Sequence, residues 1–299
     1  MLIRPKCLIC YNTGIEIYSK TINDRDLINF FLSYYGRGKN VKKFIKKLEK
    51  YKYTLLKCYK CQFIWQKYSL ENKLQEQLYD KLISPKKSYE KSKKNIKLFK
   101  EKFNFEFNIL NKINPKKNYK ILDYGAGWGS WILSLNYTLT NIFALETSKK
   151  RVKYLKIKKI NVINFNDLKK KTKFDFIRLE QVLEHIDDFD HVLKNLKKIL
   201  NNNSLVYISV PNSKILFKKK YKQNLLIKGP AQPLEHLNSF TPISMNMLLK
   251  KHNFKKVSSF LLLKAFFINK KFSLGFIKTV LRIIINNLNS TSILFKKNY

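Results

Sequence analysis

Short apolar runs alternate with amphipathic stretches through the second half of the chain. Five runs have the length and apolar content of buried strands: 119–124, 141–146, 161–165, 174–180 and 204–210. Three stretches between them repeat apolar residues at helical spacing: 128–135, 148–156 and 188–200. Strands that alternate with helices predict a doubly wound, mostly parallel sheet. A ligand site is expected at the carboxyl ends of such strands.

The part of the chain before this alternation is predicted to be largely helical. Helical spacing covers four stretches: 24–35, 41–50, 71–82 and the lysine-rich 88–113. Asn114 and Pro115 end the last of them. Four apolar residues on one side of that helix are predicted to be core: Phe99, Phe103, Phe107 and Leu110.

After the alternating region, the sequence predicts the last strands over 255–268 and then a helix over 272–288. Lys278 and Arg282 lie four residues apart in this helix, which is apolar on most faces. Such a helix can pack on the N-terminal part, pair with another subunit or lie on an anionic membrane surface. Packing is favoured because packed helices outnumber interfacial ones.

A glycine-rich turn follows the first strand of the alternating region. The segment 120–130 reads K-I-L-D-Y-G-A-G-W-G-S, with an acid at Asp123 and glycines at 125, 127 and 129. The whole chain has only eight glycines, so three at one turn indicate a backbone that a ligand approaches closely. Glu146 lies 23 residues after Asp123, at the end of the next strand, where an acid can bind ribose hydroxyls. The alternative for Glu146 is a place beside a helix cap.

The charge of the chain permits two interpretations. The net charge is +41, from 61 basic and 20 acidic residues, which is typical of nucleic-acid or anionic-membrane binders. Arginine occurs only six times and alanine four times, whereas lysine, asparagine, isoleucine, phenylalanine and tyrosine abound, as A/T-rich codons would give. Phosphate recognition favours arginine. Compositional drift is therefore favoured, and nucleic-acid binding stays open.

The sequence predicts a cytoplasmic protein. The start has a proline and two cysteines where a secretory signal needs an apolar core. No stretch reaches the roughly 18 uninterrupted apolar residues of a membrane span.

The cysteines form two C-x-x-C pairs. Cys7 with Cys10 and Cys58 with Cys61 account for every cysteine in the chain. Each pair can present two thiolates to one zinc ion, and four thiolates leave no open position for chemistry. A structural zinc site is therefore predicted, although the 47 residues between the pairs exceed usual ribbon spacing. A redox pair or buried thiols are the alternatives.

Several collinear segments resemble the class I S-adenosylmethionine (SAM)-dependent methyltransferases. The glycine turn is similar to their D-x-G-x-G-x-G motif. The segment 174–188 resembles their F-D-x-I … V-L-E-H-x-x-D motif, 209–212 the end of a fifth strand, and 235–254 a later H-x-x-x-F-T … L-L … G-F segment, with Asn253 where glycine is usual. The resemblance covers about 116–257.

The resemblance implies a set of cofactor contacts. The glycine motif would line the methionine end, and Glu146 would hold the ribose. Asp167 would face the adenine amino group, with Asn166 as a rival, and Glu180 with Gln181 would close the floor near the sulfonium. The implied cofactor residues are Asp123, Gly125, Gly127, Gly129, Glu146, Asp167, Glu180 and Gln181.

Candidates for removing a proton from the methyl acceptor form two Glu-His pairs, Glu184-His185 and Glu235-His236. The alternative is that Glu184-His185 only braces its loop. Certain quinone O-methyltransferases resemble this segment but hold a divalent cation with E-x-x-E-H. Gln181 stands at the first of those positions here, which argues against a catalytic metal.

The arrangement of a four-cysteine module ahead of such a domain resembles that of sugar C-methyltransferases and related enzymes of surface-polysaccharide pathways. The predicted function is methylation of a small molecule, such as a nucleotide-linked sugar or other polysaccharide precursor. The alternatives are an RNA methyltransferase that uses the zinc module and basic surface, and a non-catalytic zinc-ribbon protein that binds nucleic acid. The acceptor, the atom methylated and the oligomeric state are not predicted.

The predicted fold is a Rossmann-like, doubly wound α/β sheet of seven strands. The expected divisions are a zinc-ribbon-like module at 1–70, a helical connector at 71–115, a SAM-binding domain at 116–270 and a helical C-terminal extension at 271–299.

Overall fold

The computed structural model describes residues 1–94, 96–135, 141–165, 167–169, 172–217, 229–258, 260–262, 264, 281 and 292–297. The chain forms two compact units. The cysteine unit comprises Met1–Ser88, Leu183–Asp190 and Pro211–Met247. The parallel-sheet unit comprises Tyr89–Val182, His191–Val210 and Leu248–Tyr299.

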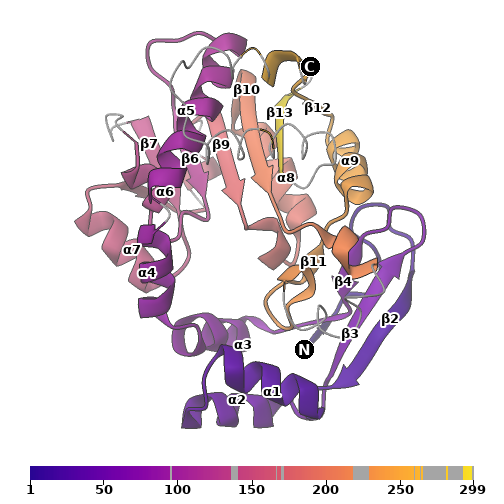
Figure 1. Cartoon of the computed structure of the whole chain (residues 1–299). Helices are drawn as coiled ribbons and strands as arrows, with labels where there is room; N and C mark the ends of the chain where they lie inside the picture. The colour runs from indigo at the N-terminus through magenta and orange to yellow at the C-terminus, as the bar shows by residue number, and fades with distance from the viewer. Residues whose placement is uncertain are drawn as a thin grey trace. The chain divides into compact units, whose positions relative to one another are not determined.

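The parallel-sheet unit is built on one sheet. Its strands are β6 (Ile121–Tyr124), β7 (Ile142–Leu145), β8 (Asn161–Ile163), β9 (Phe174–Glu180), β10 (Leu200–Ser209), β12 (Phe254–Lys256) and β13 (Ser292–Lys297). They are hydrogen-bonded in the order β12-β13-β10-β9-β6-β7-β8 (Figure 1). The five strands from β10 to β8 run parallel, whereas β13 runs antiparallel to both of its neighbours. The predicted mostly parallel sheet is therefore confirmed.

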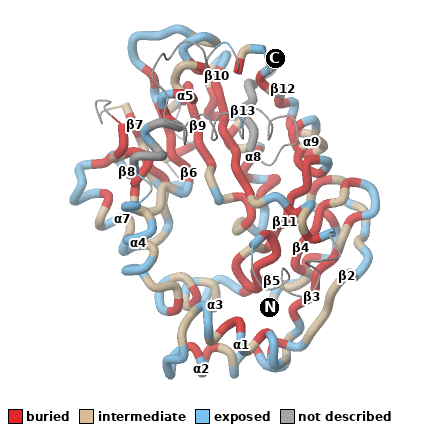
Figure 2. Tube along the Cα trace, viewed as in Figure 1, coloured by how far each residue is buried: buried red, intermediate tan, exposed pale blue. Residues whose placement is uncertain are grey.

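Helices α5 (Ile96–Ile113), α6 (Ser130–Leu133) and α7 (Lys149–Ile157) lie within this unit. Three others pass from one unit into the other: α4 (Pro85–Lys94), α8 (Phe189–Lys198) and α9 (Pro242–Lys251). The core joins Phe103 and Leu110 of α5 to Ile121, Phe176 and Tyr207 of the sheet, and β6, β9 and β10 are buried along most of their length (Figure 2). The predicted apolar side of α5 is thus confirmed at Phe103 and Leu110. The side chain of Phe99 lies outside the described residues.

The end of the chain differs from the prediction. We expected the last strands within 255–268 and a helical extension from 271, but β13 lies at Ser292–Lys297, between β10 and β12. This segment, S-I-L-F-K-K, does not alternate apolar with polar residues, so its hydrogen bonds to β10 and β12 identify it as a strand. The predicted helix at 272–288 lies outside the described residues, except Leu281. Among the helices that the structure describes, none is long and apolar enough to cross a membrane.

The cysteine unit contains a second, smaller sheet. Its order is β11-β4-β3-β2, with β2 at Gly14–Thr21, β3 at Lys52–Cys58, β4 at Ile64–Gln66 and β11 at Asn238–Ser239. All neighbours in it are antiparallel. A short pair, β1 (Leu2–Ile3) with β5 (Tyr68–Ser69), lies apart from it. Because β11 comes from the third stretch of this unit, the N-terminal sheet is completed by residues that the sequence had assigned to the SAM-binding domain.

Helices cover this smaller sheet. They are α1 (Arg25–Tyr34), α2 (Lys39–Leu48), α3 (Asn72–Gln77) and η1 (Leu78–Leu82). Asp24 caps α1, accepting a hydrogen bond from the backbone amide of Asp26. The buried faces of the helices meet Tyr53, Leu55 and Ile64 of the sheet in one apolar core. Short 3-10 turns in the later stretches are η4 (Leu183–His185), η5 (Ser213–Phe217) and η7 (Gly229–Ala231).

Candidate functional site

The three glycines of the turn after β6 have different roles. Their φ angles are all positive, at +76° for Gly125, +59° for Gly127 and +67° for Gly129. A Cβ on Gly125 would lie 2.6 Å from Val182, and a Cβ on Gly129 would lie 2.6 Å from Leu155. Among the residues that the structure describes, none has an atom within 4 Å of a Cβ on Gly127. Gly125 and Gly129 are therefore required by packing, and Gly127 is the position where a ligand can approach the backbone.

Glu146, at the end of β7, holds this turn from the side. Its Oε2 accepts a hydrogen bond from the amide of Gly127 at 2.9 Å. Its Oε1 accepts from the amides of Thr147 and Ser148 at 2.8 and 2.9 Å. Arg151 lies 3.5 Å from Oε2. These three hydrogen bonds occupy most of the roughly four acceptor positions of a carboxylate, so Glu146 is fixed in place with acceptor capacity left on Oε2.

Asp123 and Glu180, which end β6 and β9, share a buried arginine that the sequence analysis missed. Arg178 lies 3.4 Å from Oδ1 of Asp123 and forms an ion pair with Glu180. Burial raises the pKa of Asp123, and the guanidinium opposes that rise. The sequence gives no signal that Asp123 is a partner of Arg178, because the pairing of β6 with β9 brings the two together.

The other predicted cofactor residues lie in loops at the same ends of the strands. The carboxylate of Asp167 accepts a hydrogen bond from the backbone amide of Asn164 at 3.0 Å. The backbone amide of Asp167 donates to Oδ1 of Asn164, also at 3.0 Å. The ring of Phe165, 49% exposed, lies edge-on to Tyr124. Gln181 has a φ of +55°, and its amide donates to the carbonyl of Ser209. Asn166 lies outside the described residues.

The four cysteines converge in the cysteine unit. The sulfur atom of Cys10 lies 3.3 Å from that of Cys58, 3.7 Å from that of Cys7 and 3.8 Å from that of Cys61. The sulfur atoms of Cys7 and Cys61 are 3.5 Å apart. Four sulfurs bonded to zinc at about 2.3 Å form a tetrahedron with edges of about 3.8 Å. The cluster therefore has the size that a zinc ion requires.

The two C-x-x-C turns also have matching backbones. The amide of Tyr11 donates to the carbonyl of Cys7, and the amide of Gln62 donates to that of Cys58. Tyr11 and Gln62 each follow the second cysteine of a pair and have φ angles of +59° and +57°. Two equivalent turns that face each other are the arrangement by which a zinc ribbon collects four thiolates.

The two predicted Glu-His pairs meet in the cysteine unit. The ring centres of His185 and His236 are 4.8 Å apart, with an angle of 76° between the ring planes. One potential metal-ligand atom from each of Glu184, His185 and His236 lies within 4.8 Å of the others. Nδ1 of His185 is 3.0 Å from the carbonyl of Glu235, and Nδ1 of His236 is 2.6 Å from that of Gly229. A carbonyl only accepts, so both histidines carry their proton on Nδ1 when neutral. The hydroxyl of Tyr79 also lies 3.2 Å from Nδ1 of His185. The acceptor nitrogen of neutral His236 is then Nε2.

Burial separates the protonation states of this cluster. It lowers the pKa of His236 to about 4, so that its imidazole is neutral at physiological pH. It raises the pKa of Glu184 to about 8, and no other residue that the structure describes donates a hydrogen bond to its carboxylate. Glu235 differs, since its Oε1 accepts from Tyr35 and from Gln232, each at 2.7 Å. His236 is therefore a better candidate base than Glu184.

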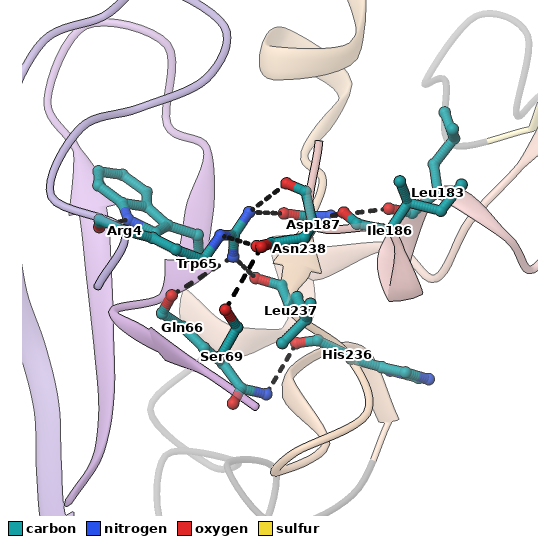
Figure 3. A network of polar contacts seen from close by, with 10 residues as sticks. All are labelled: Arg4, Trp65, Gln66, Ser69, Leu183, Ile186, Asp187, His236, Leu237 and Asn238. Atoms are coloured by element: carbon teal, nitrogen blue, oxygen red, sulfur yellow. Dashed lines mark hydrogen bonds and ion pairs between the residues drawn. The ribbon is translucent and has the colours of Figure 1, made fainter. Parts of the chain in front are cut away.

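A network of polar contacts around the buried side chains of Arg4 and Asn238 anchors the segments that carry these histidines (Figure 3). Arg4 pairs with Asp187 at 2.8 Å and donates to the carbonyl of Leu237 and to Oδ1 of Asn238. Asn238 in turn donates to the carbonyls of Leu183 and Ile186. The η4 segment and the β11 segment are thus tied to each other through the N-terminus of the chain. Burial lowers the pKa of Arg4 to about 10, against the opposing charge of Asp187, and the guanidinium stays charged.

We expect Glu184 to lower the free energy of unfolding as the pH rises. The unfolded chain ionises this group near pH 4.5, whereas the folded chain keeps its proton up to about pH 8, so stability falls between these values and is level above them. The Glu184→Gln variant should match the wild type near pH 4.5 and exceed it by a few kcal/mol at pH 8. Urea unfolding at each pH measures this difference. Exposed Glu49→Gln is the control, and equal pH dependence in Glu184→Gln and wild type would contradict the assignment.

The sheet, its glycine turn after β6 and the acid at the end of the next strand together define a class of protein: a parallel α/β domain that binds a ligand at its strand ends. Residues 89–259 match the model of the methyltransferase domain family. The chain therefore belongs to the methyltransferase domain family.

Individual proteins are similar to this chain in sequence or in fold. The chain is 30% identical over 125 residues to a ubiquinone biosynthesis O-methyltransferase of Pelagibacter ubique (strain HTCC1062), a match that covers 39% of this chain and 52% of that protein. The chain thus spans about half the length of this curated relative. The crystal structure of the plantazolicin methyltransferase BamL with a desmethylPZN analog and SAH is similar in fold, with a TM-score of 0.54, 14% identity, and coverage of 75% of this chain and 94% of that one. The crystal structure of the plantazolicin methyltransferase BpumL gives a TM-score of 0.50 at 15% identity, with coverage of 76% of this chain and 94% of that one.

Proposed function

We propose that this chain is a SAM-dependent methyltransferase that acts on a small molecule. The observation that carries the proposal is the turn at Gly127, whose open backbone lies beside the fixed carboxylate of Glu146 in a chain of the methyltransferase domain family. A nucleoside needs both features, because its ribose requires a fixed acceptor and its attached chain must pass close to the backbone.

The residues present fit SAM. The cofactor supplies a methyl group on a cationic sulfonium, and the chain offers carboxylates at three strand ends through Asp123, Glu146 and Glu180. Glu146 would accept a hydrogen bond from a ribose hydroxyl through Oε2. Asp167 would make a polar contact with the adenine, and the exposed ring of Phe165 would pack against it. Asp123 and Glu180 would face the cationic end. Methyl transfer needs an in-line approach more than strong acid or base catalysis, so positioning is the main task of these residues.

We infer that the acceptor atom is a hydroxyl oxygen. A hydroxyl loses its proton as it attacks the methyl group, and an unprotonated imidazole can accept that proton. His236 is neutral at physiological pH and has Nε2 as its acceptor nitrogen. His185 has the same tautomer, held by the carbonyl of Glu235. The O-methyltransferase name of the Pelagibacter relative supports the same acceptor type. Protonated Glu184 would serve as a neutral neighbour rather than as the base.

We further propose that the four cysteines hold one structural zinc ion. The sulfur separations of 3.3 to 3.8 Å support this proposal, as do the matching turns. Four thiolates complete a tetrahedral site, so the ion would stabilise the cysteine unit and take no part in methyl transfer.

The experiment that tests the function has two stages. SAM and SAH are first titrated into the protein by calorimetry, and we expect binding with micromolar dissociation constants. Methyl transfer from labelled SAM is then measured to three acceptors: a catechol or hydroquinone, a nucleotide-linked sugar and a short RNA. Transfer to a hydroxyl of either small molecule supports the proposal, and transfer to RNA alone contradicts the small-molecule acceptor. Absence of SAM binding would falsify the methyltransferase function.

A further inference from the structure

Arg178 is a charged residue in the interior of the parallel sheet. It lies on β9, and its side chain is 5% exposed. Its register partners are Asp123 on β6 and Tyr207 on β10. Because side chains alternate along a strand, Phe176, Arg178 and Glu180 share one face of β9. Arg178 therefore lies between the apolar core, which contains Phe176, and the carboxyl end of the strand, where Glu180 lies.

Both sides of the guanidinium are matched to this position. Its carbon lies 4.9 Å from the ring centre of Trp131 and 5.8 Å from that of Tyr207, which are cation–π distances. Its nitrogen atoms reach Asp123 at 3.4 Å and form an ion pair with Glu180. The arginine is thus held by aromatic rings from the core and binds the carboxylates of two neighbouring strands.

The charges at these strand ends do not cancel. Two carboxylates and one guanidinium carry a net charge of −1, with Glu146 of β7 as a further acid that acts on Asp123. SAM carries a sulfonium and an ammonium against one carboxylate, for a net charge of +1. SAH lacks the sulfonium and is net neutral. The group of Asp123, Arg178 and Glu180 is therefore complementary to the substrate cofactor and less so to its product.

We propose that Arg178 is a positioning residue for the cofactor: it holds Asp123 and Glu180 together as a pair of ionised acceptors for the cationic end of SAM. Without it, two carboxylates at adjacent strand ends in a buried site would share a proton, and one acceptor would lose its charge. The inference deepens the proposed function and rests on it.

The alternative is a buried ion pair that serves only the fold. Buried ionic groups can often be replaced by apolar residues of similar volume without loss of stability, so stability alone does not separate the two roles. Proton release on binding does. If one carboxylate is protonated in the free Arg178→Met variant, SAM must displace that proton when it binds, and calorimetry in two buffers of different ionisation enthalpy counts it.

We expect Arg178→Met to bind SAM at least tenfold more weakly than the wild type at pH 6 and to regain much of the difference at pH 8.5. Binding at pH 6 should release close to one proton, and the preference for SAM over SAH should fall. Arg178→Lys retains the positive charge but loses the two-pronged guanidinium that reaches both carboxylates. Its affinity for SAM at pH 6 should therefore lie between those of the wild type and Arg178→Met.

The matched control is Lys116→Met. Lys116 pairs at 2.6 Å with the buried carboxylate of Asp175, which lies on the same strand at its amino end. This variant should lose stability while its SAM binding keeps the wild-type pH dependence.

The inference is overturned if Arg178→Met melts cooperatively, binds SAM within twofold of the wild type at pH 6 and releases no proton. If Arg178→Met does not fold, Arg178→Lys decides, and wild-type affinity with a wild-type pH profile overturns the inference. A wild-type protein that binds no SAM contradicts the proposed function instead, so the two failures are distinguishable.

Discussion

We expect the Glu146→Ala variant to lose about a hundredfold in affinity for SAM. Two effects combine in it. A hydrogen bond to a charged group contributes about 1.5–3 kcal/mol, and the remaining acceptor position of Glu146 can bind one ribose hydroxyl, which the variant loses. The amide of Gly127 also loses its acceptor, since Glu146 binds it at 2.9 Å, and the turn that the cofactor contacts is released. Calorimetric titration of SAM into the folded variant measures the change.

Glu146→Gln is the matched variant. Its side-chain oxygen can still accept from one backbone amide, but it has no charge and fewer acceptor positions, so affinity should fall by about tenfold. Thermal melting of both variants checks that the parallel-sheet unit is folded. A folded Glu146→Ala variant that binds SAM within threefold of the wild type would remove Glu146 from the cofactor site.

The second large effect is expected from Cys58→Ser. The purified wild type should contain one zinc ion per chain, and the variant should contain far less than one. Structural zinc sites bind with apparent free energies of about 10–16 kcal/mol, so much of the stability of the cysteine unit should be lost. Cys58 ends β3, which pairs with β2 and β4, and the loss will reach the whole small sheet.

The loss of zinc should affect methyl transfer more than cofactor binding. Glu184, His185 and His236 belong to the same unit as the cysteines, whereas the glycine turn and Glu146 belong to the other. Metal analysis, methyl transfer and SAM titration are therefore measured together on Cys58→Ser and on the chelator-treated wild type, which zinc should restore. Ser33→Ala, on helix α1 of the same unit, is the control. A metal-free wild type with full thermal stability would contradict the zinc proposal.

The parts of the fold that the sequence predicted well are those with local signals. The strand at Phe174–Glu180 has the predicted bounds, and α1 and α7 begin and end within a residue of the predicted stretches. A buried parallel strand is a continuous apolar run, and a surface helix has an apolar stripe, so each is visible in a short window. The strand β2 was missed because most of its residues are exposed or half-buried and no apolar run marks it.

The candidate site was predicted where one residue type determines the chemistry and missed where partners are distant. Glycines with positive φ and paired cysteines are recognisable from spacing. The contacts of Arg178 with Asp123 and of Arg4 with Asp187 and Leu237 are not, because these partners come from another strand and from segments far along the chain. The separate tasks of Gly125, Gly127 and Gly129 also required the structure, since Val182 and Leu155 decide them.

The strand β11 has a consequence for how the protein is made. Its residues Asn238–Ser239 pair with β4, and Arg4, near the start of the chain, binds Asn238. A ribosome that synthesises the chain from its N-terminus has already released β6 to β10 before β11 exists. Pairings of such long sequence separation form late. Both cysteine turns are complete early, but the edge of β4 stays open until most of the other unit has been synthesised. An open strand edge can pair with wrong strands, so this interval is when the nascent chain is most prone to misfold.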